Sequence, residues 1–555
     1  MRFCYLLLLA AVIFTISCIP VEDTSNKPEV PTQTASSVEF YDNDLNRGVV
    51  GGNVRVVKAL TEKNIQRYCL YWGISDRQRI AGGLIADLTA DNSDLSCDIS
   101  IGTVPPETAT HILVYTKNKV GLSKKLVSCP IDDRYLILVE SFDSEGDFVS
   151  FDPEVLGGRL YFKMETEESG TEVFYLDTNL ESGIIKDINT GSGGSLINSM
   201  TVYSGRLYFG AYDGSEMGLW RLTASMVTAE QVVLSDYQYF APQHLTVFNG
   251  YIYMSGSGSD SQRELWRYNG TSGARFSLIN SLNPADPRSL TVLGSSTMVF
   301  SADDGNSGRE LWKTNGVSVE IVSDIIAGVC DSDPDDITVF NNKAVFTATT
   351  EFYGKEPFVT DGTSAGTFML KDIRSGVGSS EPLYYTVAGN YIYFSANNGI
   401  NGRTLWRTDG TYAGTVMISG LNSTGASNPS SLYGGNSSLW FAADDGINGQ
   451  ELWFADNGVS EARLISNIIN DNGSFPSSIV EYNGLIYFIA RLPSGGRGVY
   501  CTDGTADGTK PVAGVNEIMA GRTPVGISLF AGNIVVFYNN NTDCTEIAVY
   551  CSNSD

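Results

Sequence analysis

One pattern of apolar and polar positions returns from about residue 150 to residue 555. An apolar run ends at a Gly or Asn pair, and it is followed by a segment of the Leu-Tyr-Phe type, a polar loop and a segment of the Glu-Leu-Trp type. A D-G-T turn and a last apolar run complete the unit. Short runs rich in aromatic and β-branched residues, separated by Gly, Asn and Asp, predict strands joined by tight turns. Each unit should therefore form four antiparallel strands.

The aromatic residue of the Glu-Leu-Trp segment sets the period of this pattern. Successive copies lie 46 to 50 residues apart. Four strands within a fixed period of this length predict one blade of a β-propeller, so the fold class is all-β. We count nine blades and keep eight as the alternative, because nine exceeds the common range. The nine positions are Phe174, Trp220, Trp266, Trp312, Phe358, Trp406, Trp453, Tyr500 and Tyr550.

The ninth unit has no room for a fourth strand after Tyr550. Upstream of the first unit, residues 135–139 (YLILV) form an apolar run that has no repeat of its own. We therefore expect residues 135–139 to supply the missing outer strand of the last blade. This pairing would close the ring and remove an exposed sheet edge, which otherwise invites aggregation.

The repeated strand and turn also carry a family signature. Residues 310–316 (ELWKTNG) and 404–415 (TLWRTDGTYAGT) resemble the ELWxxDGT repeats of bacterial proteins, which are sometimes linked with hyalin-type repeats. The resemblance covers roughly residues 150–555. It implies a β-propeller on exported or surface proteins, in a family for which no common chemistry is established.

The N-terminal segments differ from the repeats. Residues 1–17 carry one Arg and an apolar run too short to span a bilayer, which predicts a signal peptide. Residues 15–18 (TISC) resemble a bacterial lipobox, which implies lipidation of Cys18; the alternative is a plain secretory signal with an accidental cysteine. Residues 18–48 are rich in Pro, Ser, Thr, Asn and Asp without apolar periodicity, which predicts a flexible tether.

Residues 49–131 predict a separate small domain that precedes a propeller formed by residues 132–555. Residues 104–118 resemble a late strand of fibronectin type III-like and related immunoglobulin-like domains, which implies a β-sandwich. Alternating apolar positions support this interpretation. The predicted strands include residues 54–57 (VRVV), 68–72 (YCLYW) and 110–115 (THILVY).

The cysteines suit an exported chain. Disulfides persist in oxidising compartments, so we expect a bridge between two of Cys69, Cys97 and Cys129, with the connectivity left open. Cys501 and Cys551 directly follow the repeated aromatic residue in successive units and are a second candidate pair; simple packing is the alternative. The chain has no C-x-x-C motif, which argues against a structural zinc site.

Charge and composition limit the class of partner. The 36 Lys and Arg residues against 63 Asp and Glu residues give a formal net charge of −27. This charge repels the phosphates of nucleic acids, so nucleic acid is not an expected partner. Only two histidines occur, His111 and His244, so the commonest general base and zinc ligand is scarce.

Two polar loops are candidate calcium sites. Asp303 and Asp304 in one loop, and Asp444 and Asp445 in another, bring carboxylates together in D-D-G-x-x-G segments, as a hard cation requires. The loops lack the alternating ligand series and the closing Glu of an EF-hand. A tight hairpin connection accounts for the same Asp and Gly residues. Calcium is thus an alternative to a structural turn, and no other cofactor is indicated.

No catalytic set of residues stands out. The chain has no G-x-S-x-G, no H-E-x-x-H and no histidine-paired nucleophile. We therefore expect a non-catalytic lipoprotein of the bacterial outer membrane or cell surface, anchored in the membrane by its N-terminal lipid, that presents the propeller to a protein or glycan. One alternative is a carbohydrate-active hydrolase or lyase with carboxylates in the propeller mouth. Another is a structural envelope or matrix protein. Unlike Asp, Glu and Arg side chains at the axis would favour the enzyme, whereas a ring of repeated polar residues would favour binding.

Overall fold

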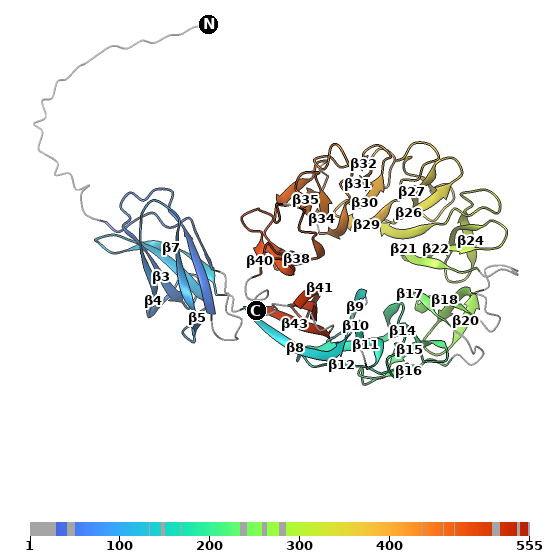
Figure 1. Cartoon of the computed structure of the whole chain (residues 1–555), viewed down its shortest axis with the longest axis horizontal. Coiled ribbons are helices and arrows are strands. Elements are labelled where there is room, and N and C mark those ends of the chain that lie inside the picture. Colours follow the sequence, from blue (N-terminus) through green and yellow to red (C-terminus); the bar gives the residue numbers. More distant parts are fainter. Residues whose placement is uncertain are drawn as a thin grey trace, which may run out of the picture. The chain divides into compact units, whose positions relative to one another are not determined.

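β-Strands form all the regular elements of the described residues in the computed structural model of the chain (Figure 1). The chain divides into two compact units, Met1–Asp133 and Arg134–Asp555. No helix in the described part is long and apolar enough to cross a membrane. The structure describes residues 29–40, 50–131, 134–145, 150–166, 168–233, 241–257, 263–276, 285–435, 437–458, 460–470, 472–512, 522–540 and 544–552.

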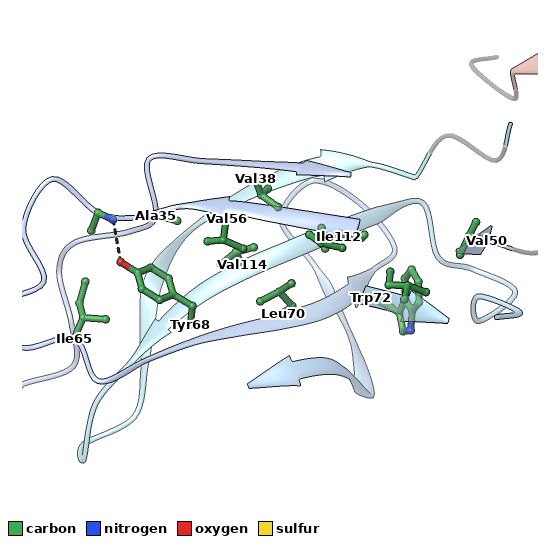
Figure 2. Close-up of a cluster of buried hydrophobic side chains, with 13 residues drawn as sticks. Ala35, Val38, Val50, Val56, Ile65, Tyr68, Leu70, Trp72, Ile112 and Val114 are labelled. Carbon is green, nitrogen blue, oxygen red and sulfur yellow. Dashed lines mark hydrogen bonds between the residues drawn. The ribbon is translucent and has the colours of Figure 1, made fainter. Parts of the chain in front are cut away.

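The first unit is a sandwich of two antiparallel sheets, as expected. Alternate residues of one central strand, Tyr68, Leu70 and Trp72, are buried between the sheets (Figure 2). The Tyr68 hydroxyl accepts a hydrogen bond from the Ala59 N–H at 2.9 Å, which satisfies the polar end of a buried ring. One sheet has the order β1(Ser37–Phe40), β2(Val50–Val57), β5(Leu95–Thr103); the other has the order β4(Arg79–Thr89), β3(Arg67–Gly73), β6(His111–Lys117), β7(Leu122–Pro130).

The predicted disulfide in this unit is wrong, because Cys69, Cys97 and Cys129 are free thiols. Cys69 lies on the face of β3 turned away from the core, where its thiol donates to Asp87 Oδ1 at 3.3 Å. Cys97 and Cys129 both pack against the core, but from different edges: β5 contacts β4, whereas β7 contacts β1. Burial also raises the pKa of Cys129 to about 12, so the thiolate needed for exchange is scarce.

The second unit contains nine four-stranded antiparallel sheets in its described part. The innermost strands contact one another in sequence, and the last, β41, contacts the first, β9, so the ring is closed. The count of nine is confirmed over the alternative of eight. The blades are β9(Ser150–Leu156), β10(Arg159–Thr166), β11(Gly170–Asp177), β12(Ser182–Ile184); β13(Met200–Tyr203), β14(Arg206–Tyr212), β15(Met217–Leu222), β16(Ala229–Gln231); β17(Gln243–Phe248), β18(Tyr251–Ser257), β19(Arg263–Tyr268), β20(Gly273–Phe276); β21(Arg288–Leu293), β22(Thr297–Asp303), β23(Arg309–Thr314), β24(Val319–Ser323); β25(Asp335–Phe340), β26(Lys343–Thr350), β27(Gly354–Thr360), β28(Phe368–Met369); β29(Leu383–Ala388), β30(Tyr391–Asn397), β31(Arg403–Thr408), β32(Val416–Met417); β33(Ser430–Gly434), β34(Ser438–Asp444), β35(Gln450–Asp456), β36(Arg463–Ser466); β37(Ser477–Tyr482), β38(Leu485–Arg491), β39(Arg497–Thr502), β40(Lys510–Pro511); and β41(Arg522–Phe530), β42(Asn533–Asn540), β43(Cys544–Ser552), β8(Arg134–Glu145).

The ring closes through a strand from the start of the unit, as the sequence predicts. Strand β8 is the outer strand of the ninth blade and pairs antiparallel with β43 (Figure 1). Leu136 lies opposite Tyr550 and Ile137 lies opposite Val549. The last blade is therefore built from both ends of the unit.

The apolar core lies between neighbouring blades. Trp312 of the fourth blade is 3% exposed and packs in one cluster with Tyr253 and Leu265 of the third. Phe162 of the first blade contacts Phe537 of the ninth, with ring centroids 5.2 Å apart. The repeated aromatic residues therefore hold adjacent sheets together, which confirms their interpretation as blade core.

The D-G-T turns link neighbouring blades by hydrogen bonds. In the fifth blade, Asp361 Oδ1 accepts the N–H of Thr363 at 2.9 Å, and Gly362 has a positive φ of 84°. A Cβ at Gly366 would lie 2.1 Å from Asp361 Oδ1, so only glycine fits there. The Gly362 carbonyl accepts a hydrogen bond from Lys313 Nζ of the fourth blade at 2.8 Å. These contacts account for the residues of the turn.

Candidate functional site

The inner strands of blades four to eight begin with a second repeated pattern that the sequence analysis missed. A small residue is followed by a variable residue x, by Pro, and by two variable residues y and z; we call this the S-x-P-y-z motif. The recurrence of Ser and Pro two residues apart could have been recognised from the sequence. The motif reads ADPRS at residues 285–289, SDPDD at 332–336, SEPLY at 380–384, SNPSS at 427–431 and SFPSS at 474–478.

The Ser of the motif anchors the connection between blades. Ser332 is fully buried, and its hydroxyl donates to Glu310 Oε2 of the fourth blade at 2.6 Å. Glu310 Oε2 also accepts the N–H of Ile325 at 2.9 Å. The same buried pairing joins Ser380 to Glu356 at 2.6 Å. The Glu of the Glu-Leu-Trp segment thus holds the connection that leads into the next inner strand.

These glutamates have perturbed pKa values but are structural. Burial raises the pKa of Glu172, Glu310 and Glu356 to about 7, although hydrogen bonds from serine hydroxyls and backbone N–H groups oppose the shift. A perturbed carboxyl is often a sign of catalysis. Here the same arrangement recurs from blade to blade, and all three side chains are fully buried, out of reach of a substrate.

The residue at x is clamped by a long side chain from the third strand of its own blade. Arg309 Nη1 donates to the Asp286 carbonyl at 2.9 Å, and Arg403 Nη1 donates to the Glu381 carbonyl at 2.8 Å. Both x residues have a positive φ, 39° and 48°, which residues other than glycine rarely adopt. The surrounding frame therefore fixes a strained backbone at this point.

Residues y and z differ among the fourth, fifth and sixth blades and are both Ser in the seventh and eighth. They lie at the end of the ring where the inner strands begin, which we call the mouth. Each z residue from the fourth to the eighth blade has a positive φ, as does His244 at the equivalent point of the third blade, and the strand register shifts there. We name six exposed or half-buried residues the mouth cluster: His244, Asp286, Arg288, Asp335, Asp336 and Tyr384.

Contacts across blades connect the mouth cluster. Asp286 pairs with Arg288 Nη2 at 2.5 Å and with Arg309 Nη2 at 3.2 Å. The Ser289 hydroxyl of the fourth blade donates to Asp335 Oδ1 of the fifth at 2.7 Å. The fourth blade thus holds its own ion-pair cluster, and one hydrogen bond joins it to the fifth blade.

The electrostatic environment of the mouth shifts two titrating groups. Desolvation raises the pKa of Asp336, and the neighbouring Asp335 raises it further, while a hydrogen bond from the N–H of Tyr384 and the charge of Lys355 lower it. Desolvation also lowers the pKa of His244, and the charges of Arg263 and Arg288 act in the same direction. The pKa of His244 therefore lies below the ordinary histidine value, and that of Asp336 lies above the ordinary aspartate value.

The calcium candidates lie in the loops that join the second and third strands of two blades. Their carboxylates accept backbone N–H groups of their own loops, which is the geometry of a turn. No group of three His, Cys, Asp or Glu side chains that could hold a metal ion occurs in the described part of the chain. The hydrogen bonds run to Asp303 Oδ1 from Gly305, to Asp304 Oδ1 from Asn306 and Ser307, to Asp444 Oδ1 from Gly446, and to Asp445 Oδ1 from Ile447 and Asn448.

Calcium titration after chelation is expected to produce no heat and no change in melting temperature. The reason is that backbone donors already occupy the carboxylate oxygens that a cation would need. Isothermal calorimetry and thermal melts measure the two quantities. Saturable heat that disappears in Asp304→Asn and Asp445→Asn variants would instead establish a calcium site.

The remaining sequence candidates do not join the mouth. Cys501 is buried on β39, where it lies opposite Tyr487. The side chain of Cys551 and all of Cys18 lie outside the described residues, so the second disulfide and the lipidation stay predictions. His111 starts β6 in the other unit, with its Nδ1 2.9 Å from the Thr110 hydroxyl.

Comparison with known proteins leaves function open. No protein-family model and no curated protein matches the chain. A prolyl endopeptidase structure is similar at 12% identity and a TM-score of 0.38, over 64% of this chain and 54% of that one. A puromycin hydrolase is similar at 12% identity and a TM-score of 0.33, over 62% and 58%. A nidogen/laminin complex is similar at 13% identity and a TM-score of 0.27, over 46% and 89%. The match spans little more than half of the two hydrolases, so nothing about activity follows from it.

Proposed function

We propose that the protein is an exported, non-catalytic binding protein that recognises a polar ligand at the propeller mouth. One observation carries the proposal. The buried small residue and the Pro recur in blades four to eight, with Ala285 in place of Ser in the fourth, whereas y and z vary at one exposed end where packing requires no variation. A constant backbone frame that presents different side chains is suited to recognising a specific ligand.

The supports also favour binding energetically. Positions x and z are held in place by buried hydrogen bonds and by clamps such as Arg309 to the Asp286 carbonyl. A preorganised site loses little conformational entropy when its ligand binds, so more of the contact energy appears as affinity. The mouth combines cationic, acidic and aromatic groups, which suits a protein or glycan surface.

A binding array tests this proposal. The chain without its first 18 residues, applied to glycan and protein arrays, is expected to retain a limited set of ligands. A Tyr384→Asn variant should weaken their binding, since Asn tolerates the positive φ of Tyr384 (63°) but removes the ring. Asp507→Asn, in the exposed D-G-T turn region of the eighth blade, is the matched control. Ligands whose binding ignores the mouth variant would contradict the assignment.

The proposed location is a membrane surface, where a lipid on Cys18 anchors the chain. The resemblance to a lipobox supports this, and the polar tether would extend the sandwich and propeller away from the bilayer. We also propose membership of the ELWxxDGT-repeat proteins and a fibronectin type III-like first domain. The division of that domain into a three-stranded and a four-stranded sheet supports the latter.

Replacing Cys18 with Ser is expected to move the protein from the membrane fraction to the soluble exported fraction. Without the cysteine no acyl chain can be attached, and the rest of the chain has strong negative charge that opposes adsorption to anionic lipid. Fractionation and metabolic labelling with palmitate measure the change. A Ser17→Ala variant keeps a small residue before the cysteine and serves as control. A Cys18→Ser protein that remains in membranes would exclude the lipid anchor.

A carbohydrate-active enzyme is the second candidate, and the unlike charged residues of the mouth favour it. Asp335 and Asp336 are adjacent carboxylates, and the raised pKa of Asp336 suits a general acid. If this function is correct, chromatography will detect shortened oligosaccharides with the native chain and none with Asp336→Asn. Binding without any cleavage would leave the non-catalytic function as the answer.

A further inference from the structure

The fifth blade presents two carboxylates at the mouth, Asp335 and Asp336, that form no ion pair with a described residue; the charge of Lys355 acts on Asp336 from a greater distance. Asp335 accepts the Ser289 hydroxyl, and Asp336 accepts the Tyr384 N–H. The guanidinium groups of Arg288 and Arg309 in the fourth blade are paired with Asp286. Two adjacent carboxylates repel each other, and a ligand cation would relieve that repulsion.

An exposed aromatic ring stands beside these carboxylates. Tyr384 occupies position z of the next blade and is 51% exposed, and its own N–H contacts Asp336. Its φ of 63° is unusual for a bulky residue, so the frame holds the ring there against a local preference. An exposed ring next to two carboxylates matches a ligand that has both a cationic group and an apolar face.

Hydroxyl groups continue the surface around the ring. Blades seven and eight have Ser at both y and z, and all four residues are half-buried. Ser301 lies opposite Arg288 in the strand register and is 1% exposed. Its hydroxyl has no hydrogen-bond partner among the described residues. Directly paired residues project from the same side of a sheet, so this hydroxyl lies on the side of Arg288. The set suits a ligand rich in hydroxyl groups.

We infer that the mouth binds an oligosaccharide of amino sugars, with an ammonium group at Asp335 and Asp336 and a sugar ring stacked on Tyr384. This inference rests on the proposed binding function. An amino sugar combines a cation, a flat C–H face and several hydroxyls at the spacing of one ring. The charge of −27 would also draw such a cationic ligand to the protein, with an association that weakens as salt increases.

The test uses the full-length chain in mild detergent and a glucosamine pentamer, with the affinity measured by calorimetry. The double variant Asp335→Asn, Asp336→Asn and the single variant Tyr384→Asn should each raise the Kd by about tenfold or more. Asp507→Asn, which removes one exposed charge away from the mouth, should leave it unchanged. Melting temperatures equal to that of the native chain show that the variants fold.

The fully N-acetylated pentamer separates the cation from the rest of the sugar. It has the same rings without the ammonium groups and should bind about tenfold more weakly or worse. Equal binding of the two pentamers, or no effect of the double variant, would overturn the inference. A lysine-rich peptide that binds with the same dependence on Asp335 and Asp336 would also overturn it, in favour of a basic protein partner.

The binding array distinguishes this failure from failure of the proposed function. If the glucosamine pentamer does not bind, but an array ligand does and loses affinity in Tyr384→Asn, the sugar class is wrong and the binding function stands. If no ligand depends on the mouth residues, both are wrong.

Discussion

Deletion of residues 132–140 is expected to lower the melting temperature of the propeller by at least about 10 °C. The deleted residues include the part of β8 that lies opposite Val549, Tyr550 and Cys551 of β43. Without β8 the ninth blade loses its outer strand, and β43 becomes an exposed edge with unsatisfied backbone groups. Thermal melts followed by circular dichroism measure the loss.

Two controls isolate ring closure from the effect of shortening the chain. Deletion of residues 20–28 from the predicted tether should leave the melting temperature unchanged. A synthetic peptide of residues 134–145, added to the deletion variant, should restore part of the lost stability by occupying the vacant edge. An unchanged melting temperature after deletion of residues 132–140 would show that pairing of β8 does not stabilise the ring.

The buried glutamates are expected to make the propeller less stable as pH rises from about 4.5 to about 7. The pKa of Glu310 is raised from 4.5 to about 7 in the folded protein, mainly by burial. The folded state therefore binds the proton more tightly than the unfolded state does. This contribution is fully present below the unfolded pKa and is lost as pH rises through the folded pKa. Each such group contributes at most about 3 kcal/mol over this window.

Glu310→Gln tests the sign and the source of this effect. Glutamine has the shape of the protonated carboxyl but does not titrate, so the variant should show a flatter dependence of the free energy of unfolding on pH. Denaturant unfolding of native and variant chains at pH 5 and pH 8 provides the comparison. The general effect of the net charge is shared by both proteins and cancels in the difference.

Glu320→Gln is the matched control, because the Glu320 side chain is 64% exposed. That variant should keep the full pH dependence of the native chain. A Glu310→Gln variant with an unchanged slope would show that the buried carboxyl is ionised throughout this range, and that its hydrogen bonds with Ser332 and Ile325 outweigh its desolvation.

Much of the propeller could be predicted because the residues that specify the strands and turns of a blade recur in each repeat. The aromatic at Trp312 and its counterparts marks a buried third strand, and the turn at residues 361–363 marks its end. The closure by residues 135–139 followed from an unpaired ninth unit and an apolar run without a repeat. In each case the signal lay within a short segment.

The disulfide prediction failed because it depended on distances that spacing does not encode. Cys97 and Cys129 both face the core of the sandwich, yet they enter it from strands at different edges. Cys69 lies on a strand of the core but points to the other face. Of the three cysteines, only Cys69 could have been excluded from a disulfide by side-chain alternation, since it falls between the inward-facing Tyr68 and Leu70.

The sequence by itself determined the period and the residues that hold the blades together, because strands, turns and burial are dictated by neighbours along the chain; it left nine or eight blades open. Tertiary structure decided which variable residues meet. Ser289 and Asp335 are 46 residues apart, and only the packing of the fourth blade against the fifth places their side chains 2.7 Å from each other. The mouth cluster thus forms because blades arranged around one axis bring together the positions at which the repeats differ.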